Sequence, residues 1–222
     1  MFRTFLAAVV LLVMTAAAPA QYSLKETGNA PPKEVPEAIR KLLSERSAQL
    51  LHKGTVLCEV WFRKEVPGKA TPQQLKSGLS YREIPETTLL AVLRVVGPIT
   101  DYRKQKIKPG VYTLRLGYQP QDGDHMGTAP HAEFLLAVPA DKEKDAAPMD
   151  PKELQSLSLR ASGTAHPAVF LLFPGDGAEA QPKLVDKGEG HQAVLQKIDV
   201  IVDGQKAPLG IALTLVGVSS AA

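Results

Sequence analysis

The sequence predicts a mainly β protein, an antiparallel β-sandwich of about eight or nine strands with a short N-terminal helix. Three observations lead to this fold class. Short apolar segments rich in β-branched residues recur along the chain, turns containing Gly and Pro separate them, and the alternating strand–helix units of a parallel sheet are absent. A closed β-barrel is the alternative, because strands of the same length and pattern build both architectures.

The segments with a strand pattern occupy most of the chain after residue 54. Along residues 108–118, the even positions from Tyr112 to Tyr118 share one face, and the odd positions from Val111 to Gly117 share the other. The last two segments are joined through Asp203-Gly204, which predicts a hairpin turn. In chain order, the expected strands lie within residues 55–66, 87–97, 108–118, 132–139, 167–174, 193–202 and 207–218.

The remaining segments are expected to be helical or irregular. Residues 36–51 (PEAIRKLLSERSAQLL) have apolar residues at near-helical spacing and predict the short helix. The end of this segment could equally be a strand that turns at Lys53-Gly54. We expect loops over residues 67–85 and 175–191, a solvated polar connection over 141–153, and a helical turn followed by a strand over 154–166.

Residues 1–20 have the three-part pattern of a secretory signal peptide. Arg3 precedes an apolar run from Phe5 to Met14, and the small residues that follow end in Ala18-Pro19-Ala20. We place the cleavage between Ala20 and Gln21. A membrane anchor is the alternative, but the run is shorter than the roughly 20 apolar residues that span a bilayer.

These features divide the chain into three parts. Residues 1–20 form the signal peptide, residues 21–35 an extended leader with Pro31-Pro32, and residues 36–222 a single β-sandwich domain. A mature chain of about 200 residues suits one or two domains, and a single domain of this length buries enough surface to fold without disulfides.

Composition argues against several classes of protein. The formal net charge of +3 comes from interspersed charges without a basic stripe, which disfavours a nucleic-acid partner. The single cysteine, Cys58, has apolar neighbours and is expected to be a small buried hydrophobic residue. No apolar segment after the signal peptide is long enough to be a transmembrane helix.

Several residues that could bind a metal ion lie together in one loop. Residues 119–131 (QPQDGDHMGTAPH) join two expected strands, and a loop of about 13 residues is long for a hairpin. Imidazole and thioether groups suit copper, and imidazoles with a carboxylate suit zinc. His125, His131 and Met126 are therefore candidate ligands for Cu or Zn, and His166 and His191 could join them if the fold brings them near.

The same loop also has a purely structural interpretation. Asp122, Gly123, Asp124 and Gly127 would shape the turn, with Asp124 or His125 bonded to loop backbone groups. Met126 would then be an apolar anchor at the end of the sandwich. The spacing of the two loop histidines matches no established metal motif, so both interpretations stay open.

Residues 101–140 resemble a group of uncharacterised secreted proteins from environmental bacteria, of the Acidobacteria and Planctomycetes type. The resemblance is carried by KPGVYTLR (108–115), QPQDGDHMG (119–127) and FLLAVP (134–139), with WFRK (61–64) and TAHP (164–167) in support. It implies export and a β-sandwich architecture, and it brings no activity, cofactor or partner with it.

These observations give three functional hypotheses. The first is an exported, periplasmic or extracellular, non-enzymatic module that binds a macromolecular or envelope partner other than nucleic acid. The alternative is an exported Cu- or Zn-binding protein that uses the 119–131 loop. The third is a hydrolase with an unrecognised site, for which the sequence offers no assigned nucleophile, base or oxyanion donors.

Overall fold

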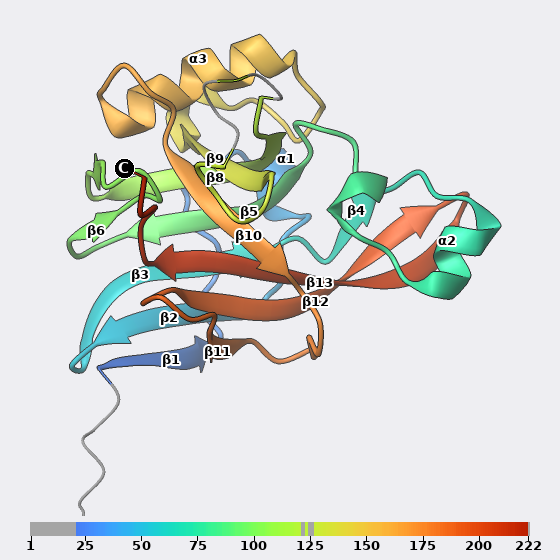
Figure 1. The fold of residues 1–222 in the computed structure, drawn as a ribbon, viewed down its shortest axis with the longest axis horizontal. Helices are drawn as coiled ribbons and strands as arrows, with labels where there is room; N and C mark the ends of the chain where they lie inside the picture. The colour runs from blue at the N-terminus through green and yellow to red at the C-terminus, as the bar shows by residue number, and fades with distance from the viewer. Residues whose placement is uncertain (1–20, 121–122, 124–126, 222) are drawn as a thin grey trace, which may run out of the picture.

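The computed structural model describes residues 21–120, 123 and 127–221, and in this part the protein is mainly β (Figure 1). No helix in the described ranges is long and apolar enough to cross a membrane. The helices are α1 (Glu37–Arg40), α2 (Pro72–Ser77) and α3 (Pro151–Ser162), with 3-10 turns η1 (Tyr81–Glu83) and η2 (Ala140–Lys142). The strands are β1 (Tyr22–Thr27), β2 (Ser47–His52), β3 (Thr55–Phe62), β4 (Glu65–Pro67), β5 (Leu89–Val95), β6 (Ile99–Thr100), β7 (Lys106–Ile107), β8 (Gly110–Tyr118), β9 (Glu133–Pro139), β10 (Val169–Pro174), β11 (Lys183–Asp186), β12 (Gln192–Val202) and β13 (Gln205–Val216).

Ten of these strands form one curled sheet with the order β1-β2-β3-β5-β8-β9-β10-β13-β12-β11. Every neighbouring pair along this path is antiparallel, while β4 adds a short parallel pairing to β12. The sheet curls into a half-barrel, and its two edge strands, β1 and β11, lie next to each other at the bottom of Figure 1.

The curl depends on β10, which changes partner halfway along its length. Residues Val169–Leu171 pair with β9, whereas Leu172–Pro174 pair with β13. Strands that pass from one part of a sheet to another in this way form its corners. Gly175 and Gly210 allow the turn, because a Cβ on either residue would overlap the backbone of the other.

The predicted β class and antiparallel pairing are confirmed, but the two-sheet sandwich is not: the ten strands are continuous in one half-barrel. The hairpin at Asp203-Gly204 is also confirmed, since these residues have φ values of 48° and 79° between β12 and β13. Lys53-Gly54 makes the same kind of turn between β2 and β3. Paired positive φ angles are typical of two-residue hairpin turns.

Several predicted segments differ from the structure. The predicted N-terminal helix shrinks to α1, because residues 47–52 form β2 as the alternative had it. The leader over residues 21–35 contains β1, which is an edge strand of the sheet. The predicted loop over 67–85 contains α2 and η1, and the loop over 175–191 contains β11. With these short elements the described strands number 13 rather than eight or nine.

The largest correction concerns residues 151–162, which form the longest helix of the described chain, α3. Asp150 caps its N-terminus by accepting hydrogen bonds from the backbone N–H groups of Lys152 and Glu153. Pro151 occupies the first turn, and Gly163 ends the helix in the left-handed conformation with φ 66°. These capping residues are present in the sequence, but residues 154–166 were predicted to be a helical turn followed by a strand.

The apolar core fills the concave side of the half-barrel. In β8 the even positions Tyr112, Leu114 and Leu116 face this core, as the alternation predicts. Cys58 is buried there as well, and burial raises the pKa of its thiol to about 12. The convex side is covered in two places, by residues 35–43 over Trp61 and by α3 over β9 and β10. Figure 1 shows α3 crossing above β8 and β9.

A buried ion pair holds the segment that leads to α3 against the sheet. Arg115 projects from the convex side of β8, and its Nε and Nη2 donate to the two carboxylate oxygens of Glu143 at 2.7 and 2.8 Å. The other guanidinium hydrogens go to the carbonyl oxygens of Thr87, Asp145 and Ala147. Most of residues 141–153 are exposed, as their charges predict, but Glu143 is the exception and is only 8% exposed.

Replacing Arg115 by Met should lower the free energy of unfolding by about 3–5 kcal/mol, because it leaves the Glu143 carboxylate buried without its partner. Urea unfolding of the mature chain measures this loss. The double variant Arg115→Met/Glu143→Leu should lose less than the sum of the two single variants. The control Lys41→Met breaks the exposed Lys41–Glu37 pair and should cost less than about 1 kcal/mol. A loss below 1 kcal/mol in Arg115→Met would contradict the role of the pair.

Candidate functional site

A cleft of about 630 Å³ lies on the convex side of the sheet, between α3 and the ends of the 119–131 loop. Phe134 and Leu136 of β9 and Val169 of β10 form its apolar floor together with Tyr102. Cavities of about 300–1,000 Å³ with an apolar floor and a few polar groups are typical of ligand sites. Its lining residues are Tyr102, Arg103, Tyr118, Gln119, Pro120, Thr128, Ala129, Phe134, Leu136, Gln155, His166, Pro167, Val169, Ser219 and Ala221.

One rim of the cleft is made of two turns, residues 101–105 and 163–167, that are joined by Gln105. The Gln105 amide donates to the Pro167 carbonyl at 2.9 Å, and its side-chain oxygen accepts from the Thr164 hydroxyl. Ser162, at the end of α3, closes the second turn by donating to the His166 carbonyl at 2.6 Å. This network fixes Arg103 and His166 on the same rim.

Asp101 shapes the first of these turns and is fully buried. Its carboxylate accepts from the backbone N–H groups of Arg103 and Gln105, from the Gln105 amide and from the backbone N–H of Val169. Burial raises the pKa of Asp101, while these hydrogen bonds act in the opposite direction. Because four donors occupy the carboxylate, we assign Asp101 a structural role and not a contact with ligand.

The opposite rim consists of the loop ends and the C-terminal tail. The backbone N–H of Gln119 donates to the Ala132 carbonyl at 2.7 Å, and the Gln119 amide donates to the Thr128 hydroxyl at 2.8 Å. The Ser219 hydroxyl donates to the Thr128 carbonyl at 2.7 Å, while its backbone N–H donates to the Tyr102 carbonyl at 2.8 Å. Residues close to the C-terminus thus connect the two rims.

The chemistry of this lining suits binding. It combines aromatic and aliphatic surface with two glutamine amides, two hydroxyl-bearing residues of the Ser/Thr type, one guanidinium and one imidazole. Asp, Glu and Cys are absent from the described lining residues.

The predicted loop residues have mixed outcomes. His125, Met126, Asp122 and Asp124 lie outside the described residues, as does Ala20 of the predicted cleavage site. Gly123 lies in a turn, and Gly127 has a φ of 76°, while the role of these residues in shaping the loop stays a prediction. The described ends of the loop, through Gln119 and Thr128, form part of the cleft.

The histidines that the structure describes do not form a metal centre. His131 contacts the Phe173 ring edge-on at 5.0 Å between centroids, and His191 lies 5.7 Å from the same ring. His166 lies on the cleft rim instead. Within residues 21–120, 123 and 127–221, no three His, Cys, Asp or Glu residues lie close enough to hold a metal ion. The Cu or Zn site on His125, His131 and Met126 stays a prediction.

His191 is buried between two aromatic rings, those of Tyr102 and Phe173. Its Nδ1 lies 3.0 Å from the Gly188 carbonyl, while its Nε2 has no hydrogen-bond partner in the described structure. Gly217 fits against this imidazole, because a Cβ there would collide with the ring. His191 thus packs against the ring of the floor residue Tyr102 and does not itself line the cleft.

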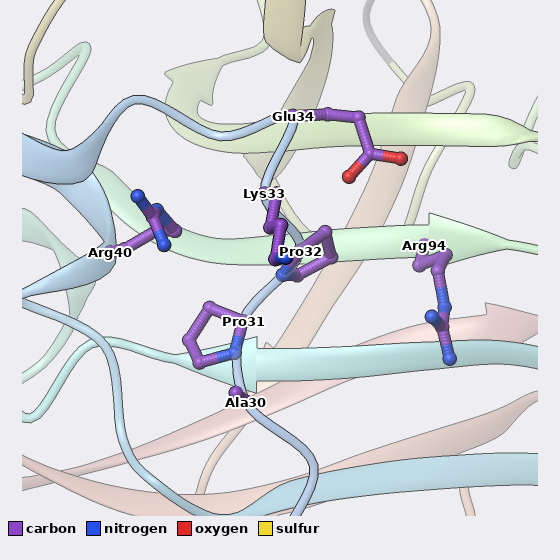
Figure 2. Close-up of a pocket in the computed structure, with 7 residues that line it drawn as sticks. All are labelled: Ala30, Pro31, Pro32, Lys33, Glu34, Arg40 and Arg94. Atoms are coloured by element: carbon purple, nitrogen blue, oxygen red, sulfur yellow. The ribbon is translucent and has the colours of Figure 1, made fainter.

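A second hollow, of about 640 Å³, lies over β3 and β5 and is lined by Ala30, Pro31, Pro32, Lys33, Glu34, Arg40 and Arg94. Figure 2 shows Arg40 and Arg94 on opposite sides of Pro32 and Lys33, so the two guanidinium groups do not point at a common centre. We regard this hollow as the outer surface of a structural network and not as a ligand site.

That network is centred on Glu59, whose side chain is fully buried on the convex side of β3. One carboxylate oxygen accepts from the Ser47 hydroxyl at 2.6 Å, the Asn29 amide at 2.7 Å and the Thr27 hydroxyl at 2.9 Å. The other accepts from Arg94 at 2.6 Å. These contacts attach β1 and the segment after it to the sheet, and a sequence search for paired carboxylates could find Glu59 but not this role.

Some residues of the cleft were not found by sequence reasoning. Tyr102 and Arg103 follow an aspartate in a polar segment, and Gln155 lies on a helix that the pattern missed. The only signal near them was Asp101, whose type favours turns. Their proximity to the 119–131 loop follows from pairing between distant strands.

The chain matches no protein-family model, no curated protein and no solved structure. The resemblance of residues 101–140 to secreted proteins of environmental bacteria therefore stays a prediction. Function has to be argued from the geometry and chemistry of the cleft.

The Glu59 network predicts a specific dependence of stability on pH. Burial alone would raise the pKa of Glu59, but the hydrogen bonds from Ser47, Asn29 and Thr27 outweigh it and hold the pKa below its usual value. A depressed carboxyl pKa stabilises the folded state above the unfolded-state pKa, and this stabilisation is lost as the pH falls through the folded-state pKa.

We therefore expect Glu59→Gln to be less stable than the natural chain at pH 7, and the difference to shrink as the pH drops below about 4. Urea unfolding of both proteins across a pH series measures this. The control Glu45→Gln removes an exposed carboxylate and should follow the natural chain at every pH. If the difference in the free energy of unfolding between Glu59→Gln and the natural chain stays the same at every pH, the expectation is contradicted.

Proposed function

We propose that this protein is an exported, non-enzymatic binding module whose ligand site is the cleft between α3, β9, β10 and the ends of the 119–131 loop. The observation that carries the proposal is the cleft itself, a cavity of about 630 Å³ with an apolar floor and polar rims. Its volume and lining are those of a site for a small molecule or for one end of a larger partner.

The rigidity of the cleft supports a binding role. The floor residues Phe134 and Leu136 belong to the middle of the sheet and are almost completely buried. One rim is fixed by Gln105 and Ser162, and the other by Gln119 and Ser219. A site that is already shaped before the ligand arrives loses less conformational entropy on binding.

The lining also supports binding over catalysis. The hydroxyl of Ser219 is engaged with the Thr128 carbonyl, and Thr128 accepts from Gln119. No general base is described beside the Ser219 hydroxyl, and nucleophilic catalysis by a hydroxyl requires one. The imidazole of His166 is exposed on the rim, where it suits hydrogen bonding to a bound molecule.

Export is proposed from residues 1–20. The Arg3 charge, the apolar run from Phe5 to Met14 and the small residues before Gln21 match a cleavable signal peptide. The partner would then be met in the periplasm or outside the cell, and it would belong to the envelope or its surroundings.

The cleft can be tested by filling it from the helix side. Gln155 is exposed and lines the cleft from α3, so Gln155→Trp places an indole into it. The probe is N-phenyl-1-naphthylamine, an uncharged dye that fluoresces in apolar sites. We expect the natural protein to bind it and Gln155→Trp to bind it about tenfold more weakly, a loss of about 1.4 kcal/mol.

The matched control is Ser156→Trp, which adds the same side chain one residue further along α3, where the position is exposed and does not line the cleft. Its affinity for the dye should stay within about twofold of the natural protein. Dye binding that is absent, or that Gln155→Trp leaves unchanged, would reject the cleft as the ligand site.

Export is tested by expressing the full chain in a Gram-negative host and determining the mass of the protein recovered from the periplasm. The predicted mature protein begins at Gln21, because cleavage follows the A-x-A site at Ala20. Replacing Ala18 and Ala20 by Arg should leave the protein uncleaved. Recovery of the intact chain from the cytoplasm alone would argue against export.

A further inference from the structure

We infer that the ligand of the cleft is an amphipathic anion, with an apolar body on the Phe134–Leu136–Val169 floor and one anionic head, such as a carboxylate, at the Arg103–His166 rim. This inference rests on the proposed binding function and adds to it the chemical class of the ligand. It is carried by the charge, burial and hydrogen bonding of the lining residues.

The rim offers two side chains, those of Arg103 and His166, that could bind a ligand. Arg103 and His166 are both exposed and both line the cleft. Neither side chain has an ion pair or a hydrogen bond within the described part of the chain. A guanidinium binds a carboxylate through two parallel hydrogen bonds, and a nearby imidazole can supply a third donor.

Backbone hydrogen bonds hold the two turns that carry Arg103 and His166 next to each other. Arg103 lies in the turn that Asp101 caps, and His166 lies in the turn that Ser162 closes. Gln105 bonds both to Asp101 and to the Pro167 carbonyl, so it fastens one turn to the other. The backbone N–H of Tyr102 also donates to the Val169 carbonyl at 2.8 Å, which ties this rim to the floor.

The described lining contains no acidic side chain that would repel an anion. The nearest carboxylate by sequence, Asp101, is fully buried and accepts hydrogen bonds from Arg103, Gln105 and Val169. Its oxygens therefore face the turn and not the cleft. Among the described lining residues, Arg103 is a cation and none is acidic, which favours an anionic partner.

The floor explains why the anion should also carry an apolar body. Phe134 and Leu136 are 8% and 7% exposed, and Val169 is half-buried beside them. Burying the remaining apolar surface of these residues and of Tyr102 against a ligand is favourable in proportion to the area removed from water. A small hydrophilic anion would leave this floor wet, whereas an aliphatic or aromatic body would cover it.

The test compares two dyes with the same anilinonaphthalene skeleton. 8-Anilinonaphthalene-1-sulfonate carries one anionic group, and N-phenyl-1-naphthylamine carries none. We expect the mature protein to bind the sulfonate more tightly. Arg103→Gln should lower the affinity for the sulfonate dye by about fivefold. It should change the affinity for the uncharged dye by less than about twofold.

The charge control is Lys106→Gln, which removes an exposed cation near the same turn that does not line the cleft. It should leave the preference for the sulfonate unchanged. If both dyes bind with equal affinity and Arg103→Gln changes neither affinity, the anionic head is rejected. The proposed binding function is then retained. If neither dye binds, the proposed function fails and this inference fails with it.

Competition against the bound sulfonate then separates two sources of a carboxylate. Dodecanoate is compared with its methyl ester, and N-acetyl-leucyl-phenylalanine with its C-terminal amide. Displacement by dodecanoate and not by its ester indicates a fatty acid, and displacement by the acidic peptide and not by its amide indicates a peptide C-terminus. If neither acid displaces the dye better than its neutral analogue, a carboxylate head is rejected.

Discussion

The buried pair between Arg115 and Glu143 is the interaction on which the convex side of this protein depends. A guanidinium in the middle of a sheet loses its hydration and needs every donor satisfied, and here a carboxylate and three carbonyl oxygens supply the partners. Three of those partners, Glu143, Asp145 and Ala147, lie on the segment between β9 and α3, and the fourth, Thr87, lies just before β5. Satisfying one charge on β8 therefore fixes the path of about ten residues of otherwise polar chain.

The cleft follows from that path. Because Arg115 holds residues 143–147 on the sheet, Asp150 lies where it can cap α3, and α3 then packs across β9 with Leu154 and Leu157. The floor of the cleft is the part of β9 and β10 that α3 leaves uncovered. Its rims are turns tied by Gln105 and by Ser219, so a few side-chain-to-backbone hydrogen bonds decide the shape of the site.

The half-barrel and the cleft are connected through β10. Its first residues, which begin with Val169 at the cleft floor, pair with β9, while its last residues pair with β13. The same strand carries Phe173, against which His131 and His191 pack. The corner that curls the sheet is thus also the place where the loop after β8 and the C-terminal tail meet.

The mainly β class, the alternation along β8 and the hairpin at Asp203-Gly204 could be predicted from the sequence, because these features depend on neighbouring residues and local backbone preference. The sequence also singled out the 119–131 loop, whose ends Gln119 and Thr128 line the cleft. The single curled sheet, the partner of Arg115 and the position of Tyr102, Gln155 and His166 around one cavity could not be predicted from the sequence. Those contacts join residues far apart in the chain, and their stability comes from burial and strand pairing that no local pattern encodes.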